Sequence, residues 1–344
     1  MKFFDFLGVR VIKTGVAIFF TALICQLLGW PPVFAVITAI VTLEPTVSDS
    51  IKKGLIRFPA SAIGSAYAVL FIALFGNSPI TYTLAAVFTI VTSYKFKLHA
   101  GLLVATITAV AMIEVVYDNY FLSFLVRLGT TSIGLIVSTI VNMFILPPNY
   151  IKEINDNINK LYRSIGRAIL TIINFEKSSS KKVNRLLNVL SKQTKKTEEL
   201  IRFQKDETNF HPLAGSKKED FFIARNQIDN LKLMVYHLTN LKNISIENVQ
   251  LTTEEKLFIE DAVESLAEHM VYNTDVDLTV HEVTIKRLMQ TFWLNNNVVT
   301  DEISDSHLPS ELILLYEISA LIQLAYEYDL VEHIIFPKEK TTEN

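Results

Sequence analysis

Cysteine is almost absent from this sequence, which has one, Cys25, among 344 residues. A single thiol cannot form a disulfide within the chain, so no disulfide framework is expected. The sequence also lacks histidine and cysteine pairs at metal-ligand spacing, and it lacks the glycine-rich loops that bind phosphates. We therefore expect no metal or other cofactor, no ATP hydrolysis by this chain and no enzymatic activity.

Charged residues are also scarce over the first 146 positions, where six apolar stretches follow one another. The stretches comprise residues 11–29, 31–45, 59–76, 79–94, 98–117 and 121–146. Most approach the roughly 20 helical residues that cross a hydrocarbon core. The predicted fold class is therefore all-α: a polytopic membrane protein in which six transmembrane helices precede a cytoplasmic antiparallel helical bundle.

Lysine and arginine are missing from every second gap between these stretches. They occur near the N-terminus, between the second and third stretches, and between the fourth and fifth, at Lys2, Arg10, Lys13, Lys52, Lys53, Arg57, Lys95 and Lys97. Basic residues stay on the cytoplasmic side of a membrane during insertion. We therefore expect both termini in the cytoplasm, with Arg127 inside the sixth stretch as the exception to the pattern.

The two halves of the chain differ in charge. Residues 1–150 contain nine basic and five acidic side chains, whereas residues 151–344 contain 23 and 30. This change predicts a transmembrane domain over 1–148, a cytoplasmic helical bundle over 149–338 and a disordered tail over 339–344. Apolar periodicity predicts the bundle's helices at 150–175, 181–206, 217–243, 253–273, 279–294 and 310–335. Membrane lipid is the expected partner of the first domain, and the acidic half has no basic stripe for nucleic acid.

The second apolar stretch is unusually short. Pro31 and Pro32 open it and Pro45 closes it, which leaves about a dozen apolar residues, too few to cross a bilayer. Proline lacks an N–H and displaces the hydrogen bond one turn back, so a carbonyl near Val41 needs another partner. A short, proline-interrupted span is typical of a transporter's binding region. The alternative is a short helix that simply stops at the cytoplasmic surface.

Two groups of charged residues are candidates for a site. Glu44, before Pro45, is either an interfacial residue paired with Lys52, Lys53 or Arg57, or a proton carrier facing a cavity. Glu114 and Arg127 are expected at similar depth in the hairpin of the fifth and sixth stretches. They form either a structural ion pair or a place where Arg127 holds an anionic substrate near the outer mouth, because the guanidinium fork suits a carboxylate.

Several segments resemble one known family. They are Val9–Gly15, Leu28–Pro32, Leu43–Thr46, and Ser50, Gly54, Arg57 and Gly64. With the helical tail, they resemble the aromatic acid exporter family, also called fusaric acid resistance-like, and its six-span Firmicute branch. The resemblance implies a bacterial plasma-membrane protein that exports aromatic carboxylic acids with the proton gradient. Larger relatives carry two six-span units where this chain has one, which implies a homodimer.

The predicted function is proton-coupled efflux of small aromatic or organic acids. The anion would arrive near Lys52, Lys53 and Arg57, Glu44 would exchange a proton, and Arg127 would guide exit. Candidate substrate or proton residues are thus Glu44, Arg127, Glu114, Arg57, Lys52 and Lys53, and the helix breaks are Pro31, Pro32 and Pro45. The alternative is a non-transporting scaffold or regulator whose cytoplasmic bundle binds a partner.

Overall fold

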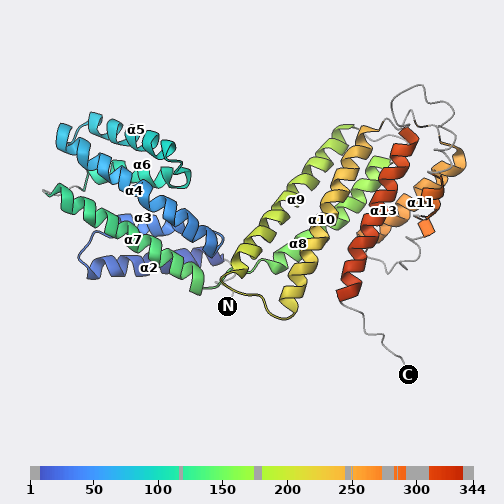
Figure 1. The fold of residues 1–344 in the computed structure, drawn as a ribbon, viewed down its shortest axis with the longest axis horizontal. Coiled ribbons are helices and arrows are strands. Elements are labelled where there is room, and N and C mark those ends of the chain that lie inside the picture. Colours follow the sequence, from blue (N-terminus) through green and yellow to red (C-terminus); the bar gives the residue numbers. More distant parts are fainter. Residues whose placement is uncertain are drawn as a thin grey trace. The chain divides into compact units, whose positions relative to one another are not determined.

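The computed structural model describes residues 8–115, 119–173, 180–244, 249, 251–272, 283–284, 286–291 and 310–335. Within these residues the regular structure is helical, so the all-α prediction is confirmed. The chain forms two compact units (Figure 1). The first comprises Met1–Asn149 and Phe203–Pro212, and the second comprises Tyr150–Arg202 and Leu213–Asn344. The assignment of Phe203–Pro212 to the first unit was not predicted.

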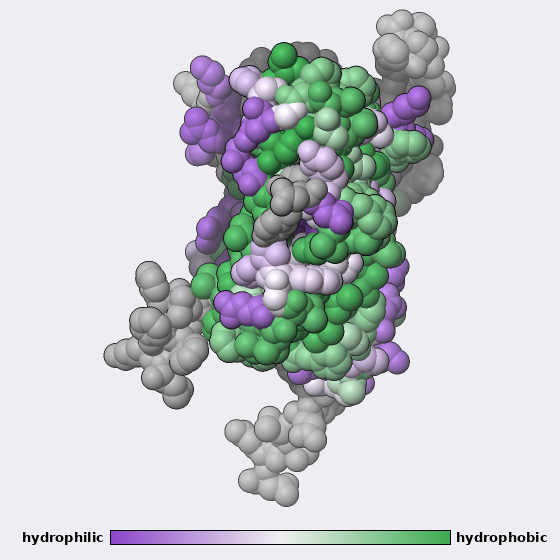
Figure 2. All heavy atoms as spheres, turned by 90° about the vertical axis from the view of Figure 1, so that its left-hand side faces the viewer, coloured by the Kyte–Doolittle hydropathy of each residue, from purple (hydrophilic) through white to green (hydrophobic). Residues whose placement is uncertain are grey.

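Apolar helices build the first unit. They are α2 (Val9–Leu27), α3 (Val33–Thr42), α4 (Val47–Phe75), α5 (Pro79–Lys95), the short η1 (His99–Gly101), α6 (Leu102–Ile113) and α7 (Tyr120–Phe144). Of the described helices, three are long and apolar enough to cross a membrane, namely α2, α4 and α7. Much of the face shown in Figure 2 is covered by hydrophobic side chains. The number of six spans stays a prediction.

Helix α4 begins well before the third apolar stretch. That stretch starts at residue 59, but the helix starts at Val47 and includes Lys52, Lys53 and Arg57. Thr46 caps it, because its side chain accepts a hydrogen bond from the Asp49 N–H at 3.0 Å. The charged residues of the gap between the second and third apolar stretches therefore form the polar end of a long helix that continues through Pro59.

Helix α3 has 10 residues, in agreement with the short second stretch. Its length is about 15 Å at 1.5 Å per residue. It packs tightly on α7, since a Cβ at Gly134 would lie 2.4 Å from the Ala35 oxygen. The buried hydroxyls of Thr38 and Thr42 donate to the carbonyls of Phe34 and Thr38 one turn back. A short helix with internally bonded hydroxyls therefore lies against the middle of a longer apolar one.

The second unit contains amphipathic helices close to the predicted ranges. They are α8 (Ile151–Ile173), α9 (Ser180–Thr208), α10 (Ser216–Asn243), α11 (Thr253–Tyr272) and α13 (Ser310–Ile335). Helix α10 packs on α8 and α13, and α11 packs on α8. On α11 the residues spaced three to four apart are buried, namely Ile259, Val263, Leu266 and Met270. Residues 283–284 and 286–291 of the helix predicted at 279–294 are helical, and the other half of that range lies outside the described residues, as does the tail at 339–344.

Helix α13 is held by two histidine–carboxylate contacts inside the second unit. His237 Nδ1 of α10 lies 2.5 Å from Glu317 Oε2, and His269 Nε2 of α11 lies 2.6 Å from Asp329 Oδ2. Both carboxylates are buried. Burying a carboxylate is unfavourable unless it is paired and hydrogen-bonded, so these contacts fix how α13 faces its neighbours.

Candidate functional site

Glu44 lies in the linker between α3 and α4 and joins two cations of α4. Its Oε2 accepts from Lys53 Nζ at 2.7 Å, and its Oε1 accepts from Arg57 Nη2 at 2.6 Å. The Arg57 Nε also donates to the Ala100 carbonyl at 3.3 Å, which connects α4 to η1. Lys52 is exposed on α4 and does not belong to this cluster.

The electrostatics of this linker favour an ionised Glu44. Burial disfavours the charged carboxyl, but the hydrogen bonds from Lys53 and Arg57 outweigh burial, and the pKa of Glu44 lies below its ordinary value. The geometry therefore matches the paired, interfacial alternative. A proton-carrying role for Glu44 requires that Lys53 and Arg57 first find another anion.

A second polar network surrounds the same linker. The Asn142 amide of α7 donates to the Glu44 carbonyl at 3.1 Å and to Ser50 Oγ at 3.0 Å. Its Oδ1 accepts from Lys13 Nζ of α2 at 2.8 Å. Lys13 is 6% exposed and Asn142 is 1% exposed. Sequence reasoning missed both residues as members of a site, although polar residues inside apolar stretches are usually functional or paired.

Arg127 lies two turns into α7 and is buried, with 4% of its surface exposed. Its guanidinium carbon sits 4.2 Å from the centre of the Phe34 ring, a cation–π contact. Its Nη2 donates to Thr108 Oγ1 of α6. The Nε and Nη1 groups have no hydrogen-bond partner within the described residues. A buried guanidinium with two free nitrogens is a site that an anion would stabilise.

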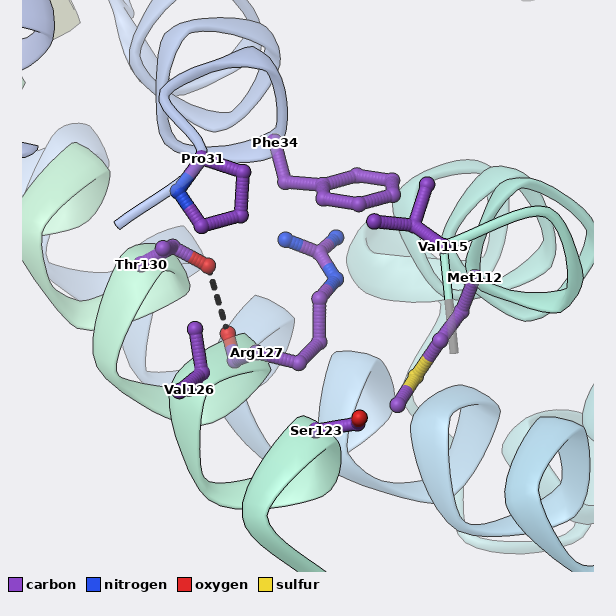
Figure 3. Close-up of a pocket in the computed structure, with 8 residues that line it drawn as sticks. All are labelled: Pro31, Phe34, Met112, Val115, Ser123, Val126, Arg127 and Thr130. Carbon is purple, nitrogen blue, oxygen red and sulfur yellow. Dashed lines mark hydrogen bonds between the residues drawn. The ribbon is translucent and has the colours of Figure 1, made fainter. Parts of the chain in front are cut away.

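A small pocket surrounds this guanidinium (Figure 3). Its lining residues come from the start of α3, the end of α6 and the first turns of α7: Pro31, Phe34, Met112, Val115, Ser123, Val126, Arg127 and Thr130. Figure 3 shows the Arg127 head group pointing beneath the Phe34 ring. The pocket has about 20 Å³ of free space, which is room for roughly one water molecule.

Glu114 does not pair with Arg127, although both residues lie in the described part of the chain. The Glu114 carboxylate accepts a hydrogen bond from the Tyr82 hydroxyl of α5, and it is exposed. The expected pair is wrong because α6 packs chiefly on α4 and α5, whereas α7 packs on α2, α3 and α4, so the two helices do not form the close hairpin that the pair requires. The neighbour of Arg127 on α6 is Thr108 instead.

Hydroxyl groups extend from the pocket into the interior of the unit. Ser61 Oγ of α4 lies 3.3 Å from both Thr108 Oγ1 and Thr131 Oγ1, and Thr131 donates to the Arg127 carbonyl. All three hydroxyl side chains are buried. The Glu44 cluster follows the other end of α3, so the two charged centres are separated by about the 15 Å length of that helix.

Comparison with known proteins shows which family the chain belongs to. Residues 5–145 match the model of aromatic acid exporter family member 1. The chain belongs to the aromatic acid exporter family. Relatives that match along almost the whole chain carry the name UPF0421 protein. One from Oceanobacillus iheyensis is 46% identical over 95% of this chain and 96% of its own length, and one from Bacillus cereus is 39% identical over 97% and 95%.

A UPF0421 protein of Staphylococcus saprophyticus is 39% identical over 78% of this chain and 83% of its own length. Membership of the exporter family and the apolar helices identify a membrane protein of a transporter family.

Proposed function

We propose that this protein exports small organic acids, chiefly aromatic carboxylates, across the bacterial plasma membrane in exchange for protons. In this proposal six spans cross the membrane, both termini are cytoplasmic, and two copies of the chain form a homodimer. The protein is then not an enzyme. The observation that carries the proposal is the Arg127 guanidinium, buried beside Phe34 with two nitrogens that have no hydrogen-bond partner among the residues the structure describes.

The chemistry of this pocket suits an aromatic carboxylate. Removing a cation from water is unfavourable, and the loss is offset when an anion and good hydrogen bonds replace the water. A carboxylate supplies both, and it accepts from a guanidinium in a planar geometry. Phe34, Met112 and Val115 provide an apolar wall for a ring. The present free space is too small for an aromatic acid, so substrate would enter after the α6 end or the α3 start moves.

Proton coupling follows from competition at the linker. An arriving carboxylate and the Glu44 carboxylate would compete for Lys53 and Arg57, which now bind Glu44 at 2.7 and 2.6 Å. Two anions cannot share these cations as favourably as one. Protonation of Glu44 would free the cations for the substrate, so one proton and one anion would be linked at the same two side chains.

Transport of benzoate into everted membrane vesicles, with an imposed proton gradient, tests the proposal. Vesicles with the protein should accumulate benzoate, and Arg127→Gln should lower uptake at least tenfold because a charge-assisted contact is lost. Arg127→Lys should retain part of the uptake, since it keeps the charge without the planar fork. Glu199→Gln, at an exposed acid of the second unit, is the control and should leave uptake unchanged. Absence of uptake across a panel of aromatic acids would overturn the proposal.

The alternative, a non-transporting scaffold, predicts a different result in the same vesicle assay. A non-transporting protein would show no uptake and would co-purify with one stoichiometric partner bound to the second unit. Stoichiometric recovery of such a partner together with unchanged benzoate uptake would favour the alternative.

A further inference from the structure

Residues Phe203–Pro212, which include the last six residues of α9, belong to the first unit although most of α9 belongs to the second. The side chain of Glu207 in this segment is completely buried, with 0% exposure. Acidic side chains are almost never fully buried unless they are paired. The proposed transport mechanism makes no use of this carboxylate, so its contacts need a separate explanation.

The Glu207 carboxylate is held at the start of α4. Its Oε2 accepts the Val47 N–H at 3.1 Å, and its Oε1 lies 2.7 Å from His211 Nδ1. Lys13 attracts it electrostatically from α2. The free N–H groups at a helix start and the helix dipole both favour an anion at this position. Glu207 thus replaces, from within the chain, the water or anion that would otherwise satisfy α4.

The hydrogen bond between Glu207 and the Val47 N–H holds the position of the linker that carries Glu44. Val47 directly follows the residues Glu44–Thr46, and its side chain is 0% exposed. Lys53 and Arg57, the cations that bind Glu44, lie about two and three turns further along α4. If Glu207 stays bound to the Val47 N–H, the amino end of α4 and the linker keep their present position. A substrate arriving at Lys53 and Arg57 needs this end of α4 to separate from its neighbours.

We propose that Glu207 is a latch that closes the linker end of the first unit, and that its release from Val47 is a step of the transport cycle. The second half of this statement rests on the proposed export function. The first half is independent of it, because it concerns only whether the contact holds Val47 inaccessible. The latch consists of Glu207 with its partners Val47, His211 and Lys13.

Accessibility of a thiol at position 47 tests the latch without any transport assay. Cys25→Ala removes the native thiol, and Val47→Cys keeps the backbone N–H that binds Glu207. A charged maleimide should label this protein slowly. Glu207→Ala should raise the labelling rate about tenfold, the equivalent of one lost hydrogen bond to a charged group. Glu199→Gln, an exposed acid on the same helix, is the matched control and should change nothing.

A second buried thiol separates release of the latch from general loosening of the fold. Ala109→Cys, fully buried on α6, should keep its slow rate in the Glu207→Ala background. Equal acceleration at both positions, or no acceleration at position 47, would overturn the latch.

Locking the contact tests its place in the cycle. In the Cys25→Ala protein, Val47→Cys and Glu207→Cys can be joined by a short, reducible bifunctional thiol reagent. Benzoate uptake should fall at least tenfold after joining and return on reduction. Uptake that persists in the joined protein would show that the linker end need not open.

If the double variant is inactive even when reduced, the labelling rate of the Cys25→Ala, Val47→Cys protein is measured with and without benzoate. A faster rate with benzoate supports release of the latch during transport, and an unchanged rate opposes it. Failure of the unmodified protein to transport would instead contradict the export proposal.

Discussion

Among the described residues of the first unit, three cationic side chains are buried, and each is stabilised in a different way. Arg57 binds a carboxylate, Lys13 binds the amide oxygen of Asn142, and Arg127 has a hydroxyl and an aromatic ring. A carboxylate offsets the loss of hydration best, a neutral amide less well, and a hydroxyl with a ring leaves donors unused. Arg127 is therefore the cation that most favours an incoming anion.

The linker ion pairs should make stability depend on pH through Glu44. Its pKa is lowered in the folded protein, so the ionised carboxylate stabilises the fold above the unfolded pKa of about 4.3, and this contribution disappears as the pH falls through the folded pKa. Glu44→Gln should lower the free energy of unfolding by about 1.5–3 kcal/mol at pH 7. Melting curves in detergent should show that the gap between the two proteins narrows toward acid pH. A gap that widens would contradict the assignment.

Asn142 should be needed for burial of Lys13. Asn142→Leu has similar volume but removes the acceptor of the Lys13 ammonium and the donor to Glu44 and Ser50. Leaving a buried charged group without its main partner costs about 1–3 kcal/mol or more. The melting temperature in detergent should fall, and adding Lys13→Met should recover part of the loss. No recovery in the double variant would show that the two residues act separately.

Small residues determine which helices of the first unit approach one another closely. The α4–α6 contact needs Gly64, where a Cβ would lie 2.4 Å from the Ala105 oxygen, and the α3–α7 contact needs Gly134. Helices α3, α6 and α7, which take part in these two contacts, also supply residues that line the pocket. Close backbone packing through small residues is the usual way that apolar helices associate in lipid. The position of Phe34 over Arg127 therefore depends on a glycine two turns away.

Gly134→Ala should disturb this packing. The added methyl group would meet the Ala35 oxygen and the Thr38 Cβ at 2.4 and 2.8 Å, so α3 must shift. Overpacking of this kind costs about 1–3 kcal/mol. Gly15→Ala on α2 is the control, because no atom lies within 4 Å of its added Cβ and alanine favours a helix by about 0.5–1 kcal/mol. Melting temperatures should move in opposite directions, and a neutral Gly134→Ala would show that α3 and α7 have room to separate.

At the scale of the whole molecule, the chain combines an apolar unit with an amphipathic helical one. The second unit has its own buried core, which includes Ile158, Leu231 and Leu266. The first unit exposes many large apolar side chains, among them Phe19, Leu55 and Val91. Exposed apolar surface of this extent is expected where lipid covers it. The two units are thus adapted to different solvents.

The predicted orientation can be measured by thiol labelling in intact cells. In the Cys25→Ala background, Asn77→Cys lies in a gap without basic residues and Phe96→Cys lies in a basic gap, and both positions are exposed. An impermeant maleimide should label position 77 in intact cells and position 96 only after the membrane is opened, because basic gaps stay inside. The reverse result would invert the topology, and labelling of both would contradict six spans.

The sequence by itself determined the all-α class, the family and most helix boundaries, because apolar period and proline positions act locally along the chain. It also identified Glu44, Arg57 and Arg127 as residues whose charge needs explanation. Only the tertiary structure decided their partners. In the structure the neighbours of Arg127 are Thr108 and Phe34, and not the expected Glu114. Packing also brings Asn142, Lys13 and Glu207 close to the linker. These partners lie up to 160 residues apart, and such contacts depend on how helices pack, which spacing along one helix does not specify.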